Sequence, residues 1–469
     1  MTRLRTLALA LAAALTGACS TMAPDYQRPM APVPATFPGQ VPTEASAVAP
    51  LADTIAWRDY FADARLRELI GLALDNNRDL RVAALNIERA RAQYRIQRAD
   101  LYPAVGASGG QSAQRLPADL SPTGDATVNR QYSATLGVSA WEIDFFGRIR
   151  SLNEQALQLY LGTEEARRAA QVSLVAEVAN AWLTLAADRE RMALAQNTYD
   201  TRRKSYELIA RSFEAGAVSA LDLRQAETQM ESARGDVALF AALVAQDENA
   251  LALLAGMPVP ERLLPSKLTD SLTAVQALPA GVPSEVLMRR PDILQAERQL
   301  RAANASIGAA RAAFFPAITL TGAAGTASAA LDGLFDGGSG TWSFMPQIRL
   351  PIFEAGRLQA SLDVAEIQRE VNVAQYEKAI QSAFREVADA LADRATLAER
   401  LDARQRMMAA SRETYRLSDA RYKGGIDSFL TVLDAQRTLY AAEQELIAVR
   451  LADAANRVAL YRALGGGWQ

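Results

Sequence analysis

Apolar and small residues recur every three or four positions over two unusually long stretches of the chain. Between Ser151 and about Phe213 there is no proline and only one glycine. One stripe of this stretch carries Val172, Val175, Ala179, Trp182, Ala186 and Ala193. The pattern predicts a helix with coiled-coil-like packing, about 90 Å long at 1.5 Å per residue. A second long helix is predicted from Arg357 to Lys423.

Shorter helical patterns accompany each long one. Residues 77–101 and 219–255 predict helices beside the first, and residues 292–315 and 428–463 beside the second. The two short helices of a pair together reach about the length of one long helix. We therefore expect them to stack end to end along it.

Two segments alternate apolar and polar residues with a period of two, which predicts strands. The apolar positions are Tyr132, Ala134, Leu136 and Val138 in one segment and Trp342, Phe344, Ile348, Leu350 and Ile352 in the other. A strand of a membrane β-barrel has this alternation, and so does a soluble strand with one solvated face. Pro346 interrupts the second segment and predicts a bend or a bulge there.

The chain contains an internal duplication. Residues 79–103 match residues 292–316 without gaps, 213 positions later, so that Tyr102 corresponds to Phe315. The block Ile143–Arg148 matches Leu350–Arg357, with two extra residues before Gly356. Further along, Tyr206, Leu208, Gly216, Ser219 and Ala226 correspond to Tyr415, Leu417, Gly425, Ser428 and Ala435, 209 positions later. Each half is predicted to contain a helix, two strands, a long helix and a short helix.

Four predicted strands cannot close a barrel, and an open sheet edge cannot lie in lipid. The long helices likewise have no core to surround within one chain. Both problems disappear if several chains form a ring, because three chains would supply twelve strands and a closed pore.

The amino-acid composition excludes several classes of function. The 469 residues carry a net charge of −3 with both signs mixed, which argues against a nucleic-acid partner. The absence of histidine excludes Ser-His-Asp and Cys-His catalysis and histidine-ligated metals. No enzyme, metal or cofactor is therefore predicted. After residue 18, no apolar run approaches the length of a transmembrane helix.

The chain begins with an export signal that ends at its only cysteine. A basic start precedes an apolar run from Leu7 to Leu15, which is too short to span a bilayer but sufficient for a signal peptide. Cys19 follows small residues and resembles the lipobox of bacterial lipoproteins, in which the thiol takes a diacylglycerol. The alternative is an ordinary signal that happens to precede a cysteine. Ser20 stands where inner-membrane lipoproteins carry aspartate, which favours the outer membrane.

Several motifs along the mature chain are specific in combination. They are PDYQRP at 24–29, Trp57, Phe61, Asp63 and Leu66, WEIDFFGR at 141–148, RRPDI at 289–293, YKGGIDSFLTVLDAQ at 422–436 and ALGGGW at 463–468. With these motifs the chain resembles the outer membrane factor family of TolC-like ducts. It is most similar to the lipoprotein drug-efflux branch, the OprM-like or NodT-type outer membrane lipoproteins.

The resemblance implies the fold class of an α+β membrane protein that forms a homotrimer in the outer membrane. A twelve-stranded β-barrel, with four strands per chain, would continue into a twelve-helix periplasmic α-barrel with a mixed equatorial belt. The implied divisions are a signal peptide at 1–18, a lipid anchor and extended strap at 19–60, a first repeat at 61–258, an equatorial linker at 259–286, and a second repeat with the C-terminal equatorial segment at 287–469.

The implied function is the passive exit channel of a tripartite, RND-type multidrug efflux system, with a periplasmic adaptor and an inner-membrane pump as partners. Two alternatives remain open. One is the exit duct of a type I secretion or metal-efflux system, and the other is a lipid-anchored coiled-coil scaffold without a pore.

The candidate sites lie at the predicted helix-hairpin turns. Adaptor-docking tips are predicted at Gly216, Ala217, Val218 and Ser219 and at Gly425, Ile426, Asp427 and Ser428, where a glycine ends one helix and a serine can cap the next. The resemblance implies a gate in which Leu430 and Asp434 share a helix face, with Arg437 able to pair with Asp434. Tyr422 or Lys423 could hold Asp222 in a latch. In the Arg290-Pro291-Asp292 motif, Asp292 is predicted to cap a helix.

Overall fold

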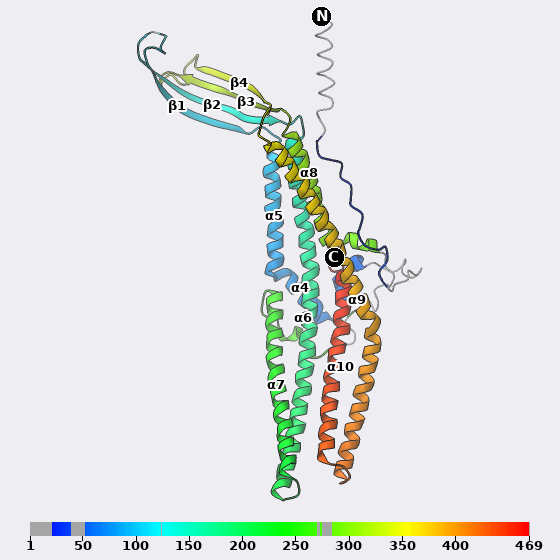
Figure 1. Cartoon of the computed structure of the whole chain (residues 1–469). Coiled ribbons are helices and arrows are strands. Elements are labelled where there is room, and N and C mark those ends of the chain that lie inside the picture. The colour runs from blue at the N-terminus through cyan, green and yellow to red at the C-terminus, as the bar shows by residue number, and fades with distance from the viewer. Residues whose placement is uncertain (1–20, 39–51, 123, 270–272, 274–283, 469) are drawn as a thin grey trace. The chain divides into compact units, whose positions relative to one another are not determined.

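The computed structural model describes residues 21–38, 52–122, 124–269, 273 and 284–468. The predicted signal peptide and Cys19 lie outside the described residues. The elements follow the expected order (Figure 1). The main helices are α4 (Ala64–Asn76), α5 (Arg78–Ala99), α6 (Arg148–Glu214), α7 (Ala220–Ala255), α8 (Pro291–Ala312), α9 (Arg357–Lys423) and α10 (Phe429–Ala463), and the strands are β1 (Val105–Leu116), β2 (Thr127–Ile143), β3 (Ala317–Ser328) and β4 (Gly340–Arg349).

The two halves repeat one another element by element, which confirms the duplication. Helices α5 and α8 each have 22 residues, and α6 and α9 each have 67. Gly147 and Gly356 precede the two long helices with φ angles of 75° and 83°. Only glycine adopts this left-handed conformation without strain, so both turns require it.

The chain divides into two compact units. One comprises Met1–Met30, Asn86–Glu164 and Gln295–Glu377, and contains the sheet and the adjoining parts of the helices. The other comprises Ala31–Leu85, Glu165–Leu294 and Lys378–Gln469, and contains the rest of the helices and the short segments between them.

The sheet in the first unit has the order β1-β2-β3-β4, with every neighbouring pair antiparallel. Its register separates an apolar face from a polar one, because directly paired residues share a face. Leu136 lies opposite Ala107 and Ala324 on the apolar face. Thr319 lies opposite Glu142 and Gln347 on the polar face. The predicted alternation is therefore confirmed within the strands, but β4 ends at Arg349, so Leu350 and Ile352 lie outside it.

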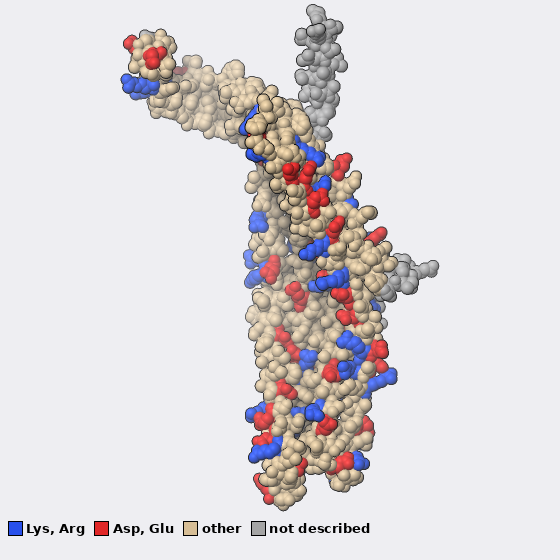
Figure 2. Space-filling view, in the orientation of Figure 1, with Lys and Arg blue, Asp and Glu red and all other residues tan. Residues whose placement is uncertain are grey.

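Charged residues are confined to the two ends of the sheet. Within the strands they are Arg115, Arg130, Glu142 and Arg349. Figure 2 shows the middle of the sheet free of charge on the visible face, whereas both signs are mixed over the helices. A band of uncharged side chains is what the hydrocarbon layer of a membrane requires of a β-barrel wall.

The expectation of a bend or bulge at Pro346 is wrong. Pro346 lies opposite Leu320 in regular register. The register instead shifts between Val138 and Trp141, where Ala140 has a φ of 51°. Strand β4 pairs only with β3 in the described part of the chain, and an edge strand accommodates proline because fewer ladder hydrogen bonds depend on it.

The second unit has a core where short segments pack against the long helices. Trp182 of α6 donates an indole hydrogen bond to the Leu263 carbonyl at 2.9 Å. The rings of Tyr60 and Tyr461 stack at 3.8 Å, and the Tyr461 hydroxyl donates to the Ile55 carbonyl. Residues from the beginning and the end of the chain thus pack together in buried positions.

Helices α6 and α7 are long and apolar enough to cross a membrane, judged by length and composition alone. This corrects the expectation that no segment after residue 18 would qualify. The apolar window of α6 is 56% buried inside the chain, as in the core helix of a folded domain, whereas that of α7 is 11% buried. Length and composition alone are weak evidence for a membrane helix, and the sheet is the stronger candidate for membrane contact.

Candidate functional site

Both predicted tips are tight turns of the same geometry. Gly216 and Gly425 end α6 and α9 with φ angles of 70° and 74°. The Ala217 amide donates to the Ser212 carbonyl at 2.8 Å, and the Ile426 amide donates to the Arg421 carbonyl at 3.0 Å. These are the backbone bonds of a Schellman motif, which lets a helix end within one residue and reverse.

The two return helices begin differently. The Ser219 hydroxyl accepts from the Asp222 amide at 3.2 Å, and the Asp222 carboxylate accepts from the Ser219 amide at 3.1 Å. This reciprocal pair is a capping box, so the predicted serine cap holds at this tip. Ser428 also occupies the N-cap position, but its side chain makes no cap hydrogen bond there.

The two hairpins pack against each other near their tips. Ile209 of α6, Ala226 of α7, and Phe429, Val432 and Leu433 of α10 form one buried cluster. Tyr422 adjoins this cluster, with its ring 5.3 Å from that of Phe429. The tips are therefore held by a common apolar core.

Beside this core lies a groove of about 340 Å³ between α7 and α10. One wall holds Arg224, Gln225, Thr228 and Gln229, and the other holds Leu430, Leu433, Asp434 and Arg437. Leu430 and Asp434 therefore line the same groove, and the Arg437 guanidinium contacts the Asp434 carboxylate at 2.5 Å. Leu430 is 56% exposed.

The other charged candidate residues near the tips have local partners. The Lys423 ammonium pairs with Asp419 at 2.7 Å, and Asp222 belongs to the capping box. Asp427 accepts two hydrogen bonds from Arg421, at 2.6 and 2.9 Å, and this pairing lowers the pKa of its carboxyl group. A latch from Asp222 to Tyr422 or Lys423 stays a prediction for the assembled protein.

A buried arginine next to the groove was not predicted from the sequence. Arg202 of α6 is 4% exposed and donates to the Gln229 carbonyl of α7 at 3.0 Å. Its guanidinium lies 5.5 Å from the ring centre of Tyr440 in α10, and the Tyr440 hydroxyl donates to Asp236 at 3.1 Å. Burial and then the Asp236 charge raise the pKa of Tyr440 to about 12. The network connects three helices, and a single sequence offers no spacing signal for it.

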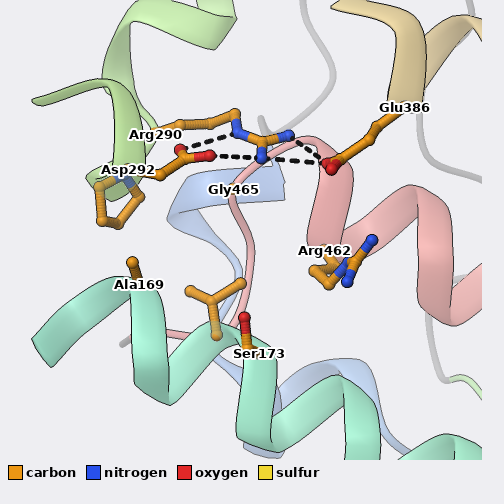
Figure 3. Close-up of a pocket in the computed structure, with 9 residues that line it drawn as sticks. Ala169, Ser173, Arg290, Asp292, Glu386, Arg462 and Gly465 are labelled. Atoms are coloured by element: carbon orange, nitrogen blue, oxygen red, sulfur yellow. Dashed lines mark hydrogen bonds and ion pairs between the residues drawn. The ribbon is translucent and has the colours of Figure 1, made fainter. Parts of the chain in front are cut away.

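A second arginine joins the start of α8 to other helices. The Arg290 guanidinium donates to Asp292 at 2.7 and 3.0 Å and to Glu386 of α9 at 3.1 Å (Figure 3). It also donates to the Ala463 carbonyl of α10 at 2.7 Å. A small cavity of about 140 Å³ adjoins these residues. The expectation that Asp292 caps α8 is wrong, because the helix begins at Pro291 and Asp292 lies within its first turn.

The segment that follows the predicted lipid site is held against α8 by polar contacts around Glu297, which we call the clasp. Glu297, with its side chain 5% exposed, accepts from Arg28 at 2.7 Å, from Arg301 at 2.9 Å and from the Tyr26 hydroxyl at 3.2 Å. Burial opposes ionisation of Glu297, but the two arginines outweigh burial and lower the pKa of the carboxyl group. The Asn304 side chain also donates to the Pro24 carbonyl at 2.7 Å.

We predict that Glu297→Gln speeds amide hydrogen exchange in residues 25–28 by about tenfold, which corresponds to about 1.4 kcal/mol. Because the folded-state pKa is lowered, the clasp stabilises the chain above the ordinary glutamate range and weakens as the pH falls through the folded pKa. The matched control is Glu366→Gln, which breaks the more exposed pair with Arg311. Equal exchange in both variants would contradict a clasp.

These features define a class of protein: a subunit of a membrane channel, with an uncharged sheet wall and long helical hairpins. The chain belongs to the outer membrane efflux protein family, whose model matches residues 69–257 and 282–466. The fold class and the outer-membrane location follow from this membership.

Relatives and solved structures agree with this assignment. The probable efflux pump outer membrane protein TtgC of Pseudomonas putida is 54% identical over 467 residues, covering 98% of this chain and 95% of the relative. The outer membrane protein OprJ of Pseudomonas aeruginosa is 46% identical over 460 residues, with 98% and 95% covered. The open state of the MtrE outer membrane channel of Neisseria gonorrhoeae has a TM-score of 0.85 at 42% identity, covering 96% of this chain and 99% of that one. A membrane protein from Pseudomonas aeruginosa reaches 0.90 at 45% identity, with 96% and 98% covered.

Proposed function

We propose that this chain forms the homotrimeric exit duct of a tripartite drug-efflux system, a passive path from the periplasm across the outer membrane. The observation that carries the proposal is the sheet, which has an uncharged middle, one apolar face and two edge strands. A membrane barrel has no edges, so β1 and β4 need partners from other copies. Three copies supply twelve strands, enough to enclose a pore.

The names of the relatives support export of drugs and solvents. Among them are an antibiotic efflux pump protein and a toluene efflux pump protein of Pseudomonas putida, both 54% identical to this chain. In the proposed system a periplasmic adaptor and an inner-membrane pump supply energy and substrate. The duct itself needs no catalytic group.

Single-channel recording in planar bilayers tests the proposal. The purified, lipid-inserted protein is expected to form discrete channels, whereas a helical scaffold without a pore would give none. Light scattering in detergent is expected to show three copies per particle. A protein that stays monomeric and does not conduct would overturn the proposed duct.

The lipid anchor is part of the proposal. Thr21 is the second residue after Cys19, and its hydroxyl bonds to Ser151 at 2.8 Å near the start of α6. The chain that follows the proposed lipid site is therefore attached to α6 from Thr21 onward.

We predict that Cys19→Ser yields an exported protein that washes off membranes more readily than the natural protein. The loss of the acyl chains removes about 0.8 kcal/mol of anchoring per buried CH₂ group. Mass spectrometry of the natural amino terminus checks the premise. An unmodified cysteine, or cleavage at another position, would contradict the proposed lipid anchor.

The tips are proposed to dock the adaptor. Ala217 and Ile426 lie in the two matching turns, and Ile426 is 65% exposed. A photo-crosslinking residue at either position is expected to capture the adaptor in cells. Phe335, in the turn between β3 and β4, is 78% exposed and serves as the control. Capture from Phe335 but not from the tips would contradict the docking role.

A further inference from the structure

A cavity of about 350 Å³ lies where the strands of the sheet end and the long helices begin. Its lining residues fall within 142–148, 312–317 and 349–358, which all belong to the first compact unit. None of the residues that line the groove at the tips lines this cavity. Small-molecule sites have volumes of roughly 300 to 1,000 Å³, so the cavity is large enough for a small ligand.

Two charged residues of the cavity lie on the polar face of the sheet. Glu142 is paired with Thr319, and Arg349 is paired with Ala317, two positions before Thr319 on β3. Residues two apart on a strand share a face, so Glu142 and Arg349 share one as well. A membrane barrel turns its polar face toward the water-filled interior. In the proposed duct, this part of the cavity therefore faces the lumen.

Four of the charged residues that line the cavity satisfy one another. The Arg148 guanidinium donates to both carboxylate oxygens of Glu142, at 2.6 and 2.8 Å. The Arg357 Nε donates to Glu354 Oε2 at 3.0 Å. Each pair joins the first residue of a long helix to the segment before that helix. These two pairs therefore have a structural role at the helix starts.

Two other polar groups of the cavity keep unused bonding capacity. The side chain of Arg349 is 84% exposed, and its guanidinium lies 4.0 Å from Glu354 Oε1, which is longer than a hydrogen bond. Asp144 Oδ2 accepts from the Arg150 amide at 2.9 Å, but Asp144 Oδ1 is buried and has no hydrogen-bond partner within the described part of the chain. A buried carboxylate oxygen is stabilised by a donor, so this atom can bind a donor from outside the chain.

Part of the cavity wall is aromatic. Phe146 and Phe315 line the cavity, and the centres of their rings lie 4.9 Å apart in a stacked arrangement. Phe315 is 42% exposed, so part of its ring is accessible to a ligand. Flat aromatic groups pack favourably against such rings. The cavity thus combines an aromatic surface with one unpaired cationic group and one unpaired acceptor.

We propose that the cavity binds aromatic zwitterions as they pass through the duct, that is, small molecules with an aromatic ring, a carboxylate and an ammonium group. Arg349 binds the carboxylate, Asp144 Oδ1 accepts a hydrogen bond from the ammonium group, and the two phenylalanine rings contact the aromatic body. Three acidic and three basic residues line the cavity, so it has no net charge that would favour a simple cation or anion. The inference rests on the proposed duct and adds a substrate class and a site to it.

Saturation-transfer NMR on the full-length, lipid-anchored protein in detergent tests the site. The three probes share an indole ring: tryptophan carries both charges, tryptamine lacks the carboxylate, and indole-3-propionate lacks the ammonium group. Tryptophan is expected to bind most tightly. Arg349→Gln is expected to weaken the binding of tryptophan and indole-3-propionate about tenfold and to leave tryptamine unchanged, because a charge-assisted hydrogen bond is lost. Asp144→Asn is expected to weaken tryptophan and tryptamine and to leave indole-3-propionate unchanged.

The matched control is Arg115→Gln, which removes an exposed arginine of β1 that does not line the cavity. Its affinities for all three probes are expected to match those of the natural protein. Micelles without protein give the background from partition of the indole ring. Arg349→Gln is the decisive variant, because its mostly exposed side chain is not needed for folding even if Asp144→Asn fails to assemble.

The outcomes separate the site from the duct. Binding of tryptophan no tighter than that of its two analogues, or equal affinities in Arg349→Gln and Arg115→Gln, would overturn the site. Single-channel recordings of the same preparations show whether the duct stands. Channels without the expected binding pattern would overturn the site alone, whereas a protein that forms no channels would overturn the duct.

Discussion

Replacing Leu430 and Asp434 with alanine is expected to raise the single-channel conductance severalfold and to weaken the preference for cations. Both residues line the groove between α7 and α10, and both side chains are more than half exposed. In a trimer, Leu430 would form an apolar ring and Asp434 a ring of three carboxylates. Rings of this kind constrict a pore and select ions by charge.

The ion pair between Asp434 and Arg437 allows a more specific prediction, because each single variant leaves the opposite charge unpaired. Asp434→Ala leaves the arginine unpaired and shifts selectivity toward anions, whereas Arg437→Ala leaves the carboxylate unpaired and shifts selectivity toward cations. Removing an exposed pair costs at most about 1 kcal/mol, so folding is expected to survive both changes. Opposite shifts in reversal potential are the signature of residues that face the ion path.

The control for the gate is Arg416→Ala, which breaks a comparably exposed pair with Glu413 on α9 outside the groove. Its conductance and selectivity are expected to match those of the natural protein. If the Asp434 and Arg437 variants also behave like the natural protein in a correctly folded trimer, these residues have only a structural role.

The parts of the fold that depend on repetition were predictable. The offsets of 213 and 209 residues between the halves are visible in the sequence, and the paired elements have matching lengths. The faces of the strands followed from the alternation, because the side chains of a strand point to opposite sides at every residue. The pairing of Leu430 with Asp434 in one groove followed in the same way from helical spacing.

The errors have a common cause. Pro346 and Asp292 were interpreted from local rules, but neighbouring elements decide what each position requires. Pro346 lies opposite Leu320 in a regular ladder with β3, so the proline does not interrupt this pairing. Asp292 binds Arg290 rather than capping α8.

The contacts of Arg202 and Arg290 could not be predicted from one sequence. Arg202 contacts residues 27 and 238 positions away, and Arg290 contacts residues 96 and 173 positions away. A buried guanidinium needs several acceptors, and these acceptors become known only when the helices are placed.

Arg290→Met is expected to destabilise the folded chain by about 3 kcal/mol. The methionine fills much of the same volume but offers no donor to the carboxylates of Asp292 and Glu386 or to the Ala463 carbonyl. The estimate lies at the lower end for a broken buried ion pair, because the two carboxylates are 42% and 32% exposed and water can replace part of the interaction. The end of α10 is expected to loosen first.

A surface arginine provides the control for this change. Arg262 is 64% exposed and pairs with Glu68, which is 46% exposed, so Arg262→Met is expected to cost less than about 1 kcal/mol. Arg290→Lys keeps the charge but lacks the planar fork that reaches three partners, so its stability should fall between those of the natural protein and Arg290→Met. The apparent melting temperatures of the three variants, measured in the same detergent, give the order directly. Equal melting of Arg290→Met and Arg262→Met would show that the joint around Arg290 contributes no more than a surface ion pair.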